Sequence, residues 1–452
     1  MSVSVGMVSL GCSKNQVDAE MLMAALARDG FELKDDAALA DIAIVNTCGF
    51  IDSAKKEAVE EILELARLKE EGRIKKIVVT GCLAQRYQDE IAKELPEVDA
   101  VLGIGANAEI AQSLRKMMEE GHAEIFPNKE AMPLLGERVL STPSYFAYIK
   151  IAEGCDNHCT YCAIPAIRGR FRSRTMEDIE AEARNLADGG AKEIILIAQD
   201  TSRYGVDLYG SYSLAPLLQR LCKIPGIRWI RTLYCYPEAV TDELLSVIAN
   251  EEKVVKYLDL PLQHASGRIL KAMNRQGDRE TLTKLIEKIR ARVPGITLRT
   301  TFITGFPGET PEDYTQLAEF VKEMRFERMG CFPYSQEDGT PAALMDGQLE
   351  EEVKLRRAEI LMDAQMTVMQ EKGESLIGSE IEMLTEGFDR YAQCYFGRSP
   401  MDSPDIDGKV FLTALDEEGE LNLPAGERPV IGDIVKVRII DCIDGDLFVE
   451  NL

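Results

Sequence analysis

The chain has 452 residues, of which 45% are hydrophobic and 29% are charged, and its formal net charge is −25. This length predicts about two to four domains, and no apolar run is long enough to cross a bilayer. The first residues lack the basic and apolar segments of a signal peptide, so we expect a cytoplasmic protein, and the negative charge argues against a basic surface that holds nucleic acid.

Three apolar runs near the N-terminus each end at a cysteine. They alternate with helical segments up to about residue 105: residues 5–10 and 15–28, 41–47 and 53–71, 76–80 and 84–95. This alternation predicts a parallel sheet with crossover helices, in which ligands gather outside the carboxyl ends of the strands. Cys12, Cys48 and Cys82 stand at those ends, so we expect them to converge and to hold a [4Fe-4S] cluster with one open iron. One such cysteine alone would more simply be buried filler.

A looser, proline-containing stretch divides the chain. We therefore place an N-terminal domain at residues 1–120, a linker at 121–143, a second domain at 144–372 and a third at 373–452. Six strand-like segments of the second domain alternate with helical segments and predict a partial (βα)6 barrel: residues 145–152, 193–198, 227–234, 255–260, 296–303 and 327–333. Sites in such barrels lie at the carboxyl ends of the strands.

The most informative spacing is C-x3-C-x2-C at Cys155, Cys159 and Cys162, which follow the first barrel strand. Three thiolates can ligate three irons of a [4Fe-4S] cluster and leave the fourth iron open to a small molecule, which makes these cysteines catalytic candidates. A structural zinc site needs four closed ligands, and His158 could supply the fourth only awkwardly. Five further cysteines are expected to be reduced and to fill space in the core: Cys222, Cys235, Cys331, Cys394 and Cys442.

Short alternating runs broken by Gly and Pro predict a small C-terminal β-barrel. Its expected strands lie at residues 380–385, 391–396, 409–412, 434–441 and 447–450. An OB-like barrel would suggest nucleic-acid binding. However, residues 377–452 hold 17 acidic and 6 basic side chains. Such acidity favours a basic protein partner, or else it serves only solubility.

The cysteine loop, with the aromatic Tyr161 directly before Cys162, resembles the radical S-adenosylmethionine superfamily. Both cysteine sets, the (βα)6 barrel and a terminal barrel similar to a TRAM domain together resemble the radical methylthiotransferases. Four stretches resemble the branch that modifies a ribosomal protein more than the tRNA branch: residues 46–52, 198–201, 262–266 and 334–341. In the last stretch, the acidic Glu337 and Asp338 would repel phosphate and attract a basic protein.

The resemblance implies methylthiolation of the β-carbon of an aspartate in small-subunit ribosomal protein number twelve. It also implies two [4Fe-4S] clusters that face one cavity, and S-adenosyl-L-methionine. Because an unactivated C–H bond has no acidic proton, a radical made at Cys155, Cys159 and Cys162 would abstract hydrogen, and the cluster on Cys12, Cys48 and Cys82 would hold the sulfur donor. An electron donor and a sulfur source, of unknown identity, are further partners. The alternatives are a tRNA (adenosine) methylthiotransferase and a binding or assembly protein whose clusters are structural or carry electrons.

Further cofactor contacts are implied for Tyr161, Gln199, Asp200, Gly305 and Gly308. Gln199 and Asp200 end the second barrel strand, where the superfamily places polar contacts to the methionyl amine, although Asp200 could instead cap a helix. The two glycines belong to a loop that resembles one near the adenosyl group, although a plain strand-to-helix turn explains them equally well.

Four arginines alternate after the cluster loop, at Arg168, Arg170, Arg172 and Arg174. Such side chains could grip the carboxylate of S-adenosylmethionine or of the substrate by bidentate pairing. For most of them we expect a solvated, ion-paired strand face instead.

Overall fold

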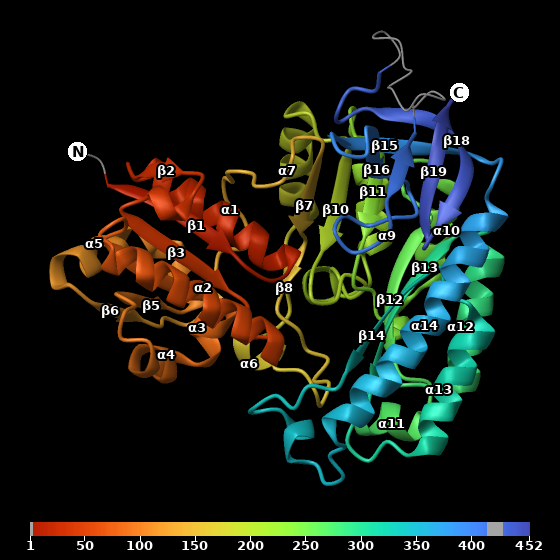
Figure 1. The fold of residues 1–452 in the computed structure, drawn as a ribbon, viewed down its shortest axis with the longest axis horizontal. Helices are drawn as coiled ribbons and strands as arrows, with labels where there is room; N and C mark the ends of the chain where they lie inside the picture. The colour runs from red at the N-terminus through yellow and green to blue at the C-terminus, as the bar shows by residue number, and fades with distance from the viewer. Residues whose placement is uncertain (1–2, 414–427) are drawn as a thin grey trace.

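The computed structural model describes residues 3–413 and 428–452 and arranges the chain in three parts (Figure 1). The acidic residues between 414 and 427 that enter the count above lie outside the described residues. No helix in the described ranges combines the length and the apolar character that a bilayer span requires.

The N-terminal part is a six-stranded parallel sheet with the order β2-β1-β3-β4-β5-β6. Its strands are β1 (Ser4–Ser9), β2 (Glu32–Lys34), β3 (Ile42–Thr47), β4 (Lys76–Gly81), β5 (Ala100–Leu102) and β6 (Ala123–Ile125). Its helices are α1 (Ser13–Arg28), α2 (Asp52–Glu70), α3 (Cys82–Arg86), α4 (Gln88–Glu94) and α5 (Ile110–Glu120). All six residues of β3 are buried, because helices cover both faces of the sheet, as is usual for parallel sheets.

The three predicted strands of this part are confirmed, but three short strands lie beyond the prediction. Strands β2, β5 and β6 have three residues each, too few for a hydrophobic period to identify them. Strand β6 lies within the predicted linker and pairs with β5, so the N-terminal sheet continues past residue 120. The single helix predicted at residues 84–95 is instead two helices that meet at Tyr87.

The central part has six parallel barrel strands in two groups of three, β11-β10-β7 and β12-β13-β14, linked by a bridge between Ile230 and Val254. The barrel strands are β7 (Phe146–Lys150), β10 (Glu193–Ile197), β11 (Trp229–Thr232), β12 (Tyr257–Gln263), β13 (Thr297–Thr304) and β14 (Arg328–Pro333), with a small hairpin of β8 (Ala152–Glu153) and β9 (Arg172–Ser173). The helices are α6 (Ile164–Arg168), α7 (Met176–Asp188), α8 (Val206–Tyr209), α9 (Leu214–Leu221), α10 (Asp242–Asn250), α11 (Gly267–Ala272), α12 (Arg279–Arg292), α13 (Pro311–Met324) and α14 (Glu351–Ser375). The predicted partial (βα)6 barrel is therefore confirmed.

Local sequence explains where the barrel helices start. Helix α13 begins with a capping box, in which the Thr310 hydroxyl accepts from the Asp313 amide and the Asp313 carboxylate accepts from the Thr310 amide. Pro311 occupies the first turn, where a missing N–H is harmless. Helix α14 packs on β14 and leads into the third part.

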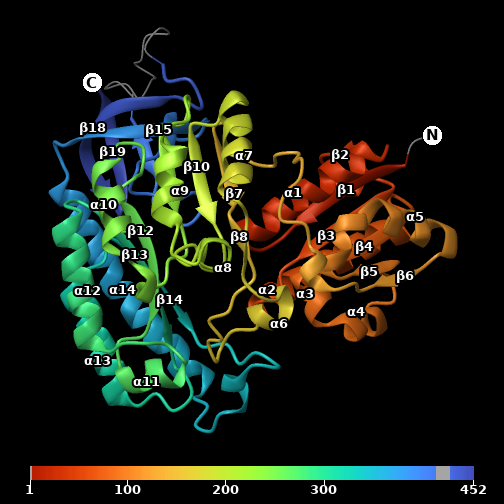
Figure 2. The ribbon, with the colours of Figure 1, turned by 180° about the vertical axis from the view of Figure 1, so that it is seen from behind.

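The C-terminal part is a closed barrel with the order β15-β16-β17-β19-β18. Its strands are β15 (Glu380–Asp389), β16 (Cys394–Arg398), β17 (Val410–Leu412), β18 (Ile434–Ile443) and β19 (Asp446–Asn451). All five predicted strands are confirmed, and with them the predicted fold class. Figure 2 shows this barrel at the same end of the molecule as α10 and far from α11.

Buried ion pairs join the terminal barrel to the central one. Glu193 of β10 accepts from Arg231 of β11 and from Arg398 of β16, each over 2.8 Å, and all three side chains are buried. Asp402 pairs with Arg328, and Asp407 accepts from the Tyr257 hydroxyl over 2.6 Å. Part of the acidity of the terminal barrel is thus used inside the molecule and does not face a partner.

Candidate functional site

The three strand-end cysteines of the N-terminal part lie at one edge of the sheet. Cys12 precedes α1, Cys48 follows β3, and Cys82 is the first residue of α3. Neighbouring glycines allow the close approach of these loops. A Cβ on Gly11 would lie 2.6 Å from the Cβ of Cys48, and a Cβ on Gly49 would lie 2.6 Å from the Cα of Leu83.

The thiols of this set influence one another. Burial, against the opposing charge of Arg168 and with smaller contributions from negative charge on Cys12 and Cys48, raises the pKa of the Cys82 thiol to about 11. For Cys12, desolvation would raise the pKa, but the positive charges of Lys14 and Arg168 outweigh it and lower the pKa. The three sulfurs therefore share one electrostatic environment, as ligands of one centre must.

The second set of cysteines lies in the loop after β8. Gly154 adopts φ +79°, and a Cβ there would lie 2.1 Å from the carbonyl oxygen of Arg170, so the loop can fold back only at a glycine. The Cys162 amide donates to the Cys159 carbonyl over 3.0 Å. Burial raises the pKa of Cys155 to about 11 and that of Cys162 to about 12. This loop therefore presents its thiols from a compact turn.

The two cysteine sets adjoin each other. Cys82 packs against Ala163 and Ile167, which directly follow the loop that ends at Cys162. Figures 1 and 2 both place α6 beside α3. Loops from two different sheets thus meet at one place, and the contact is made by the residues next to the predicted ligands.

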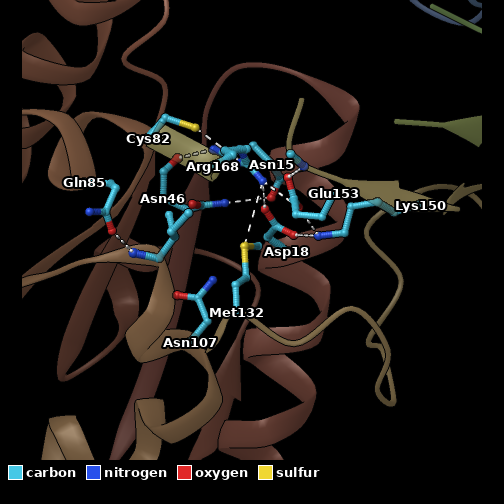
Figure 3. A network of polar contacts seen from close by, with 12 residues as sticks. Asn15, Asp18, Asn46, Cys82, Gln85, Asn107, Met132, Lys150, Glu153 and Arg168 are labelled. Atoms are coloured by element: carbon cyan, nitrogen blue, oxygen red, sulfur yellow. Dashed lines mark hydrogen bonds and ion pairs between the residues drawn. The ribbon is translucent and has the colours of Figure 1, made fainter. Parts of the chain in front are cut away.

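A buried network of charged and polar side chains lies at this junction (Figure 3). The guanidinium of Arg168 donates to the sulfur of Cys82 over 3.3 Å, to Asp18 over 2.9 Å and to Glu153 over 3.0 Å. Lys150 completes the network through Asp18 and through Glu153. The expectation of a solvated arginine face is thus wrong for Arg168, and likewise for Arg174, which is also buried. Only Arg170 matches it, exposed and paired with Asp156.

The predicted cofactor residues at the end of β10 hold the cysteine loop. The Asp200 carboxylate accepts from Asn157 over 2.8 Å, from the Ser202 hydroxyl over 2.6 Å and from the Arg203 amide over 3.2 Å. The Gln199 amide donates to Glu153 over 2.8 Å. These contacts fix the loop that carries Cys155. Asp200 closes a turn with Ser202 and Arg203 and does not cap a helix, because the next helix, α8, has Gly205 as its N-cap.

The two glycines of the predicted adenosyl loop have packing roles in this structure. A Cβ on Gly305 would lie 2.3 Å from the Cγ of Lys354, so the glycine admits α14 to the end of β13. The Gly308 amide donates to the carbonyl of Gly347 over 2.8 Å. Tyr161 packs beside Met273 and Phe306, next to the cysteine loop.

Three residues near Cys159 were not among the predicted site residues. The Tyr236 hydroxyl lies 3.6 Å from the sulfur of Cys159, and the Arg275 guanidinium stacks on the Tyr236 ring, 4.1 Å from its centroid. Within the described ranges, Nε and Nη1 of Arg275 have no hydrogen-bond partner, although the side chain is buried. Asn157 is the third. Tyr236 follows β11, so the rule that sites lie at strand ends could have identified it.

The expectation that Glu337 attracts a basic protein is wrong. Glu337 is only 2% exposed and pairs with Lys55 over 3.2 Å and with Arg86 over 2.8 Å. Both partners belong to the N-terminal part. Glu337 therefore joins two parts of the molecule and does not face a basic partner, although its neighbour Asp338 is exposed.

The donor set fits iron–sulfur clusters. Two groups of three thiols, one from three loops and one from a single loop, are the ligands that such clusters use. Within residues 3–413 and 428–452, no three histidine, cysteine or acidic side chains stand close enough to hold a single metal ion. The buried walls around Cys82, Cys155 and Cys159 are typical of cluster surroundings.

Three family models match the chain. They are described as "Uncharacterized protein family UPF0004" over residues 4–103, "Radical SAM superfamily" over 149–321 and "TRAM domain" over 377–451. A protein of Desulforamulus reducens named "Ribosomal protein uS12 methylthiotransferase RimO" is 47% identical over 451 residues, which cover 99% of both chains. The chain belongs to the RimO family. The predicted resemblance to the branch that modifies a ribosomal protein is therefore confirmed.

Other RimO relatives and solved structures agree. The RimO protein of Pelotomaculum thermopropionicum is 49% identical over 91% of this chain and 93% of its own. Among solved structures, the radical S-adenosylmethionine methyltransferase TsrM of Kitasatospora setae, with tryptophan and a cofactor analogue bound, has a TM-score of 0.56. It is 15% identical and covers 93% of this chain and 84% of its own, a likeness of fold alone.

Proposed function

We propose that this RimO-family enzyme transfers a methylthio group to the β-carbon of an aspartate in ribosomal protein uS12. The observation that carries the proposal is that the two three-cysteine sites adjoin, since Cys82 of one set packs against Ala163, the residue after Cys162 of the other. A binding or assembly protein would not need two incompletely ligated sites side by side. The choice of uS12 as the substrate rests on the relatives at 47–49% identity, which are named for that protein.

We assign Cys155, Cys159 and Cys162 to one [4Fe-4S] cluster and Cys12, Cys48 and Cys82 to a second. The match to the radical S-adenosylmethionine superfamily supports an iron–sulfur cluster and S-adenosylmethionine. When bound, S-adenosylmethionine would supply the radical and the methyl group, one cluster would pass on an electron from an external donor, and the other would hold sulfur from an external source. The second cluster rests on the convergence of the three strand ends.

The chain itself positions and shields these groups. Asn157 and Asp200 hold the Cys155 loop in one conformation, and Glu153 ties that loop to β10 through Gln199. Tyr236 and Arg275 line the loop at Cys159. Burial keeps other hydrogen donors and oxidants away from a reactive radical, so that the radical reacts with the substrate.

The partners follow from the substrate. A basic ribosomal protein suits a chain of net charge −25, and a ribosomal substrate places the reaction in the cytoplasm. The reaction also requires an electron donor and a sulfur source. The tRNA alternative shares every cysteine, but no contact in the described structure favours it.

The test is mass spectrometry of uS12 after anaerobic incubation with the reconstituted enzyme, S-adenosylmethionine, sulfide and a reductant. We expect one methylthiolated aspartate peptide. Cys159→Ala should abolish both the product and the cleavage of S-adenosylmethionine. Cys48→Ala should abolish the product but leave the cleavage intact. Product formation by Cys48→Ala at the unmodified rate would contradict the assignment of the second site.

A further inference from the structure

Arg168 is the side chain that links the two cysteine sites: it contacts Cys82 of one set and follows the loop of the other along the chain. It ends α6, directly after the loop of Cys155, Cys159 and Cys162, and it is only 1% exposed. Its Nη2 lies 3.3 Å from the sulfur of Cys82, which belongs to the other set (Figure 3). A guanidinium is always charged, so this contact is a charge-assisted N–H···S hydrogen bond.

The surroundings of Arg168 balance its charge and fix its direction. Two buried carboxylates, Asp18 and Glu153, face it, and the buried ammonium of Lys150 pairs with both carboxylates. Two further neighbours are Asn15, whose Oδ1 accepts from Nη2 over 3.3 Å, and Met132, whose sulfur accepts from Nη1 over 4.0 Å. These groups give two positive and two negative charges before the sulfur is counted. A thiolate at Cys82 would therefore lie beside a guanidinium whose orientation is fixed by two carboxylates.

The same network reaches the loop of the first cysteine set. Oε1 of Glu153 accepts from the Gly154 amide over 3.1 Å and from Gln199 over 2.8 Å. The Cys155 amide donates to the carbonyl of Gly169, next to Arg168, over 3.2 Å. The loop that carries Cys155 and the donor to Cys82 are thus parts of one hydrogen-bonded unit.

We propose that Arg168 is a positioning residue of the second cluster: through its hydrogen bond to the sulfur of Cys82 it makes that cluster easier to reduce and couples it to the loop of the first. The inference rests on the proposed function, because it takes Cys82 as a cluster ligand. Reduction adds negative charge to a cluster, and hydrogen bonds to its sulfurs stabilise the reduced form. The effect is strong at a site removed from water, where charge is poorly screened.

The test isolates the second cluster in the full-length chain by replacing Cys155, Cys159 and Cys162 with Ala. Its reduction potential is then measured by titration with detection by electron paramagnetic resonance. In this background, Asp18→Asn with Arg168→Gln removes the cation at Cys82 while leaving the buried network neutral. We expect the cluster to become harder to reduce by about tenfold in the reduction equilibrium, a shift of about 59 mV for one electron.

A second variant gives the opposite sign. Glu153→Gln removes the negative charge that faces Arg168 and keeps one accepting oxygen, so the cluster should become easier to reduce. The matched control is Arg170→Gln, two residues further along the chain, which is exposed and paired with Asp156 and should leave the potential unchanged. Iron content and thermal unfolding are measured for each variant.

The outcomes separate the two proposals. If the three-alanine parent binds no iron, the assignment of Cys12, Cys48 and Cys82 is wrong, and this inference falls with it. If the parent binds its cluster but both variants keep its potential, Arg168 is only a structural ion pair and the inference is wrong. If the double variant loses its iron, the reduction potential of Glu153→Gln decides between the two readings. A cluster that is harder to reduce in Glu153→Gln, or one with an unchanged potential, overturns the inference.

Discussion

Arg86 and Glu337 form a buried ion pair between two parts of the molecule, with 2.8 Å between Nη1 and Oε2. Arg86 lies in the helix that begins at Cys82, and it also donates to the carbonyl of Gly49, next to Cys48, over 2.8 Å. Glu337 belongs to the loop after β14 and accepts from Lys55 as well. The ion pair therefore fixes the central barrel against two of the loops that carry the second cysteine set.

Replacing Glu337 should loosen this junction. Glu337→Ala leaves Arg86 buried without its carboxylate, which should lower the free energy of unfolding by about 3–5 kcal/mol. Chemical unfolding followed by tryptophan and far-ultraviolet signals measures the change. Asp338→Ala, at the exposed neighbour, should cost less than about 0.5 kcal/mol. Equal effects of the two substitutions would contradict a special role for the buried pair.

A glycine test addresses the convergence of the cysteines. Gly81 has φ +95°, and a Cβ there would lie 2.5 Å from the carbonyl oxygen of Thr47, beside Cys48. Gly81→Ala should therefore separate the loops of Cys48 and Cys82 and lower the iron content by that of one cluster. Gly30→Ala is the matched control, since its φ is +91° but nothing lies within 4 Å of the added Cβ. We expect it to cost about 1–3 kcal/mol of backbone strain and no iron.

The predicted filler cysteines offer a third test. Cys331 is buried in the main core, and burial raises the pKa of its thiol to about 12. Cys331→Ala should keep the iron content and the cleavage of S-adenosylmethionine, whereas Cys12→Ala should lose the iron of the second cluster. Iron counting after anaerobic reconstitution compares the two. Loss of iron from Cys331→Ala would show that the cysteines were wrongly divided.

The sequence predicted those features that rest on local pattern. The strands that precede Cys12, Cys48 and Cys82 are apolar runs followed by a turn, so both the strands and the convergence of the cysteines follow from the rule for parallel sheets. The strands of the central barrel follow from apolar runs that alternate with helical segments, and those of the terminal barrel from short alternating runs broken by Gly and Pro. These predictions need only the period of the chain and the place where each strand ends.

Contacts between distant residues could not be predicted in this way. Arg168 lies among alternating arginines, a pattern that suggests a wet strand face, and only the packing of α6 on α3 buries it. Glu337 looks like a surface acid in the sequence, but the N-terminal part covers it. The direction of such side chains depends on how the parts pack against one another. The hydrophobic period of a single sequence does not reveal this packing.

Acid should weaken the attachment of the terminal barrel. Desolvation would raise the pKa of Glu193, but Arg398 and Arg231 outweigh it and hold the pKa below the usual range. Because the folded pKa is lowered, the pairing stabilises the protein above the usual pKa of glutamate, and this stability is lost as pH falls through the folded pKa. Glu193→Gln should lower the free energy of unfolding at pH 7. In this variant the free energy of unfolding should also fall less steeply below about pH 4. Unfolding curves across this range measure both effects, and parallel curves for the two proteins would contradict the account.

The most direct test of the central claim offers both substrates at once. The reconstituted enzyme is incubated anaerobically with S-adenosylmethionine, sulfide, a reductant, uS12 and tRNA, and mass spectrometry then follows both macromolecules. We predict a methylthio-aspartate peptide from uS12 and unchanged tRNA. A methylthio-adenosine nucleoside with unmodified uS12 would contradict the proposed substrate.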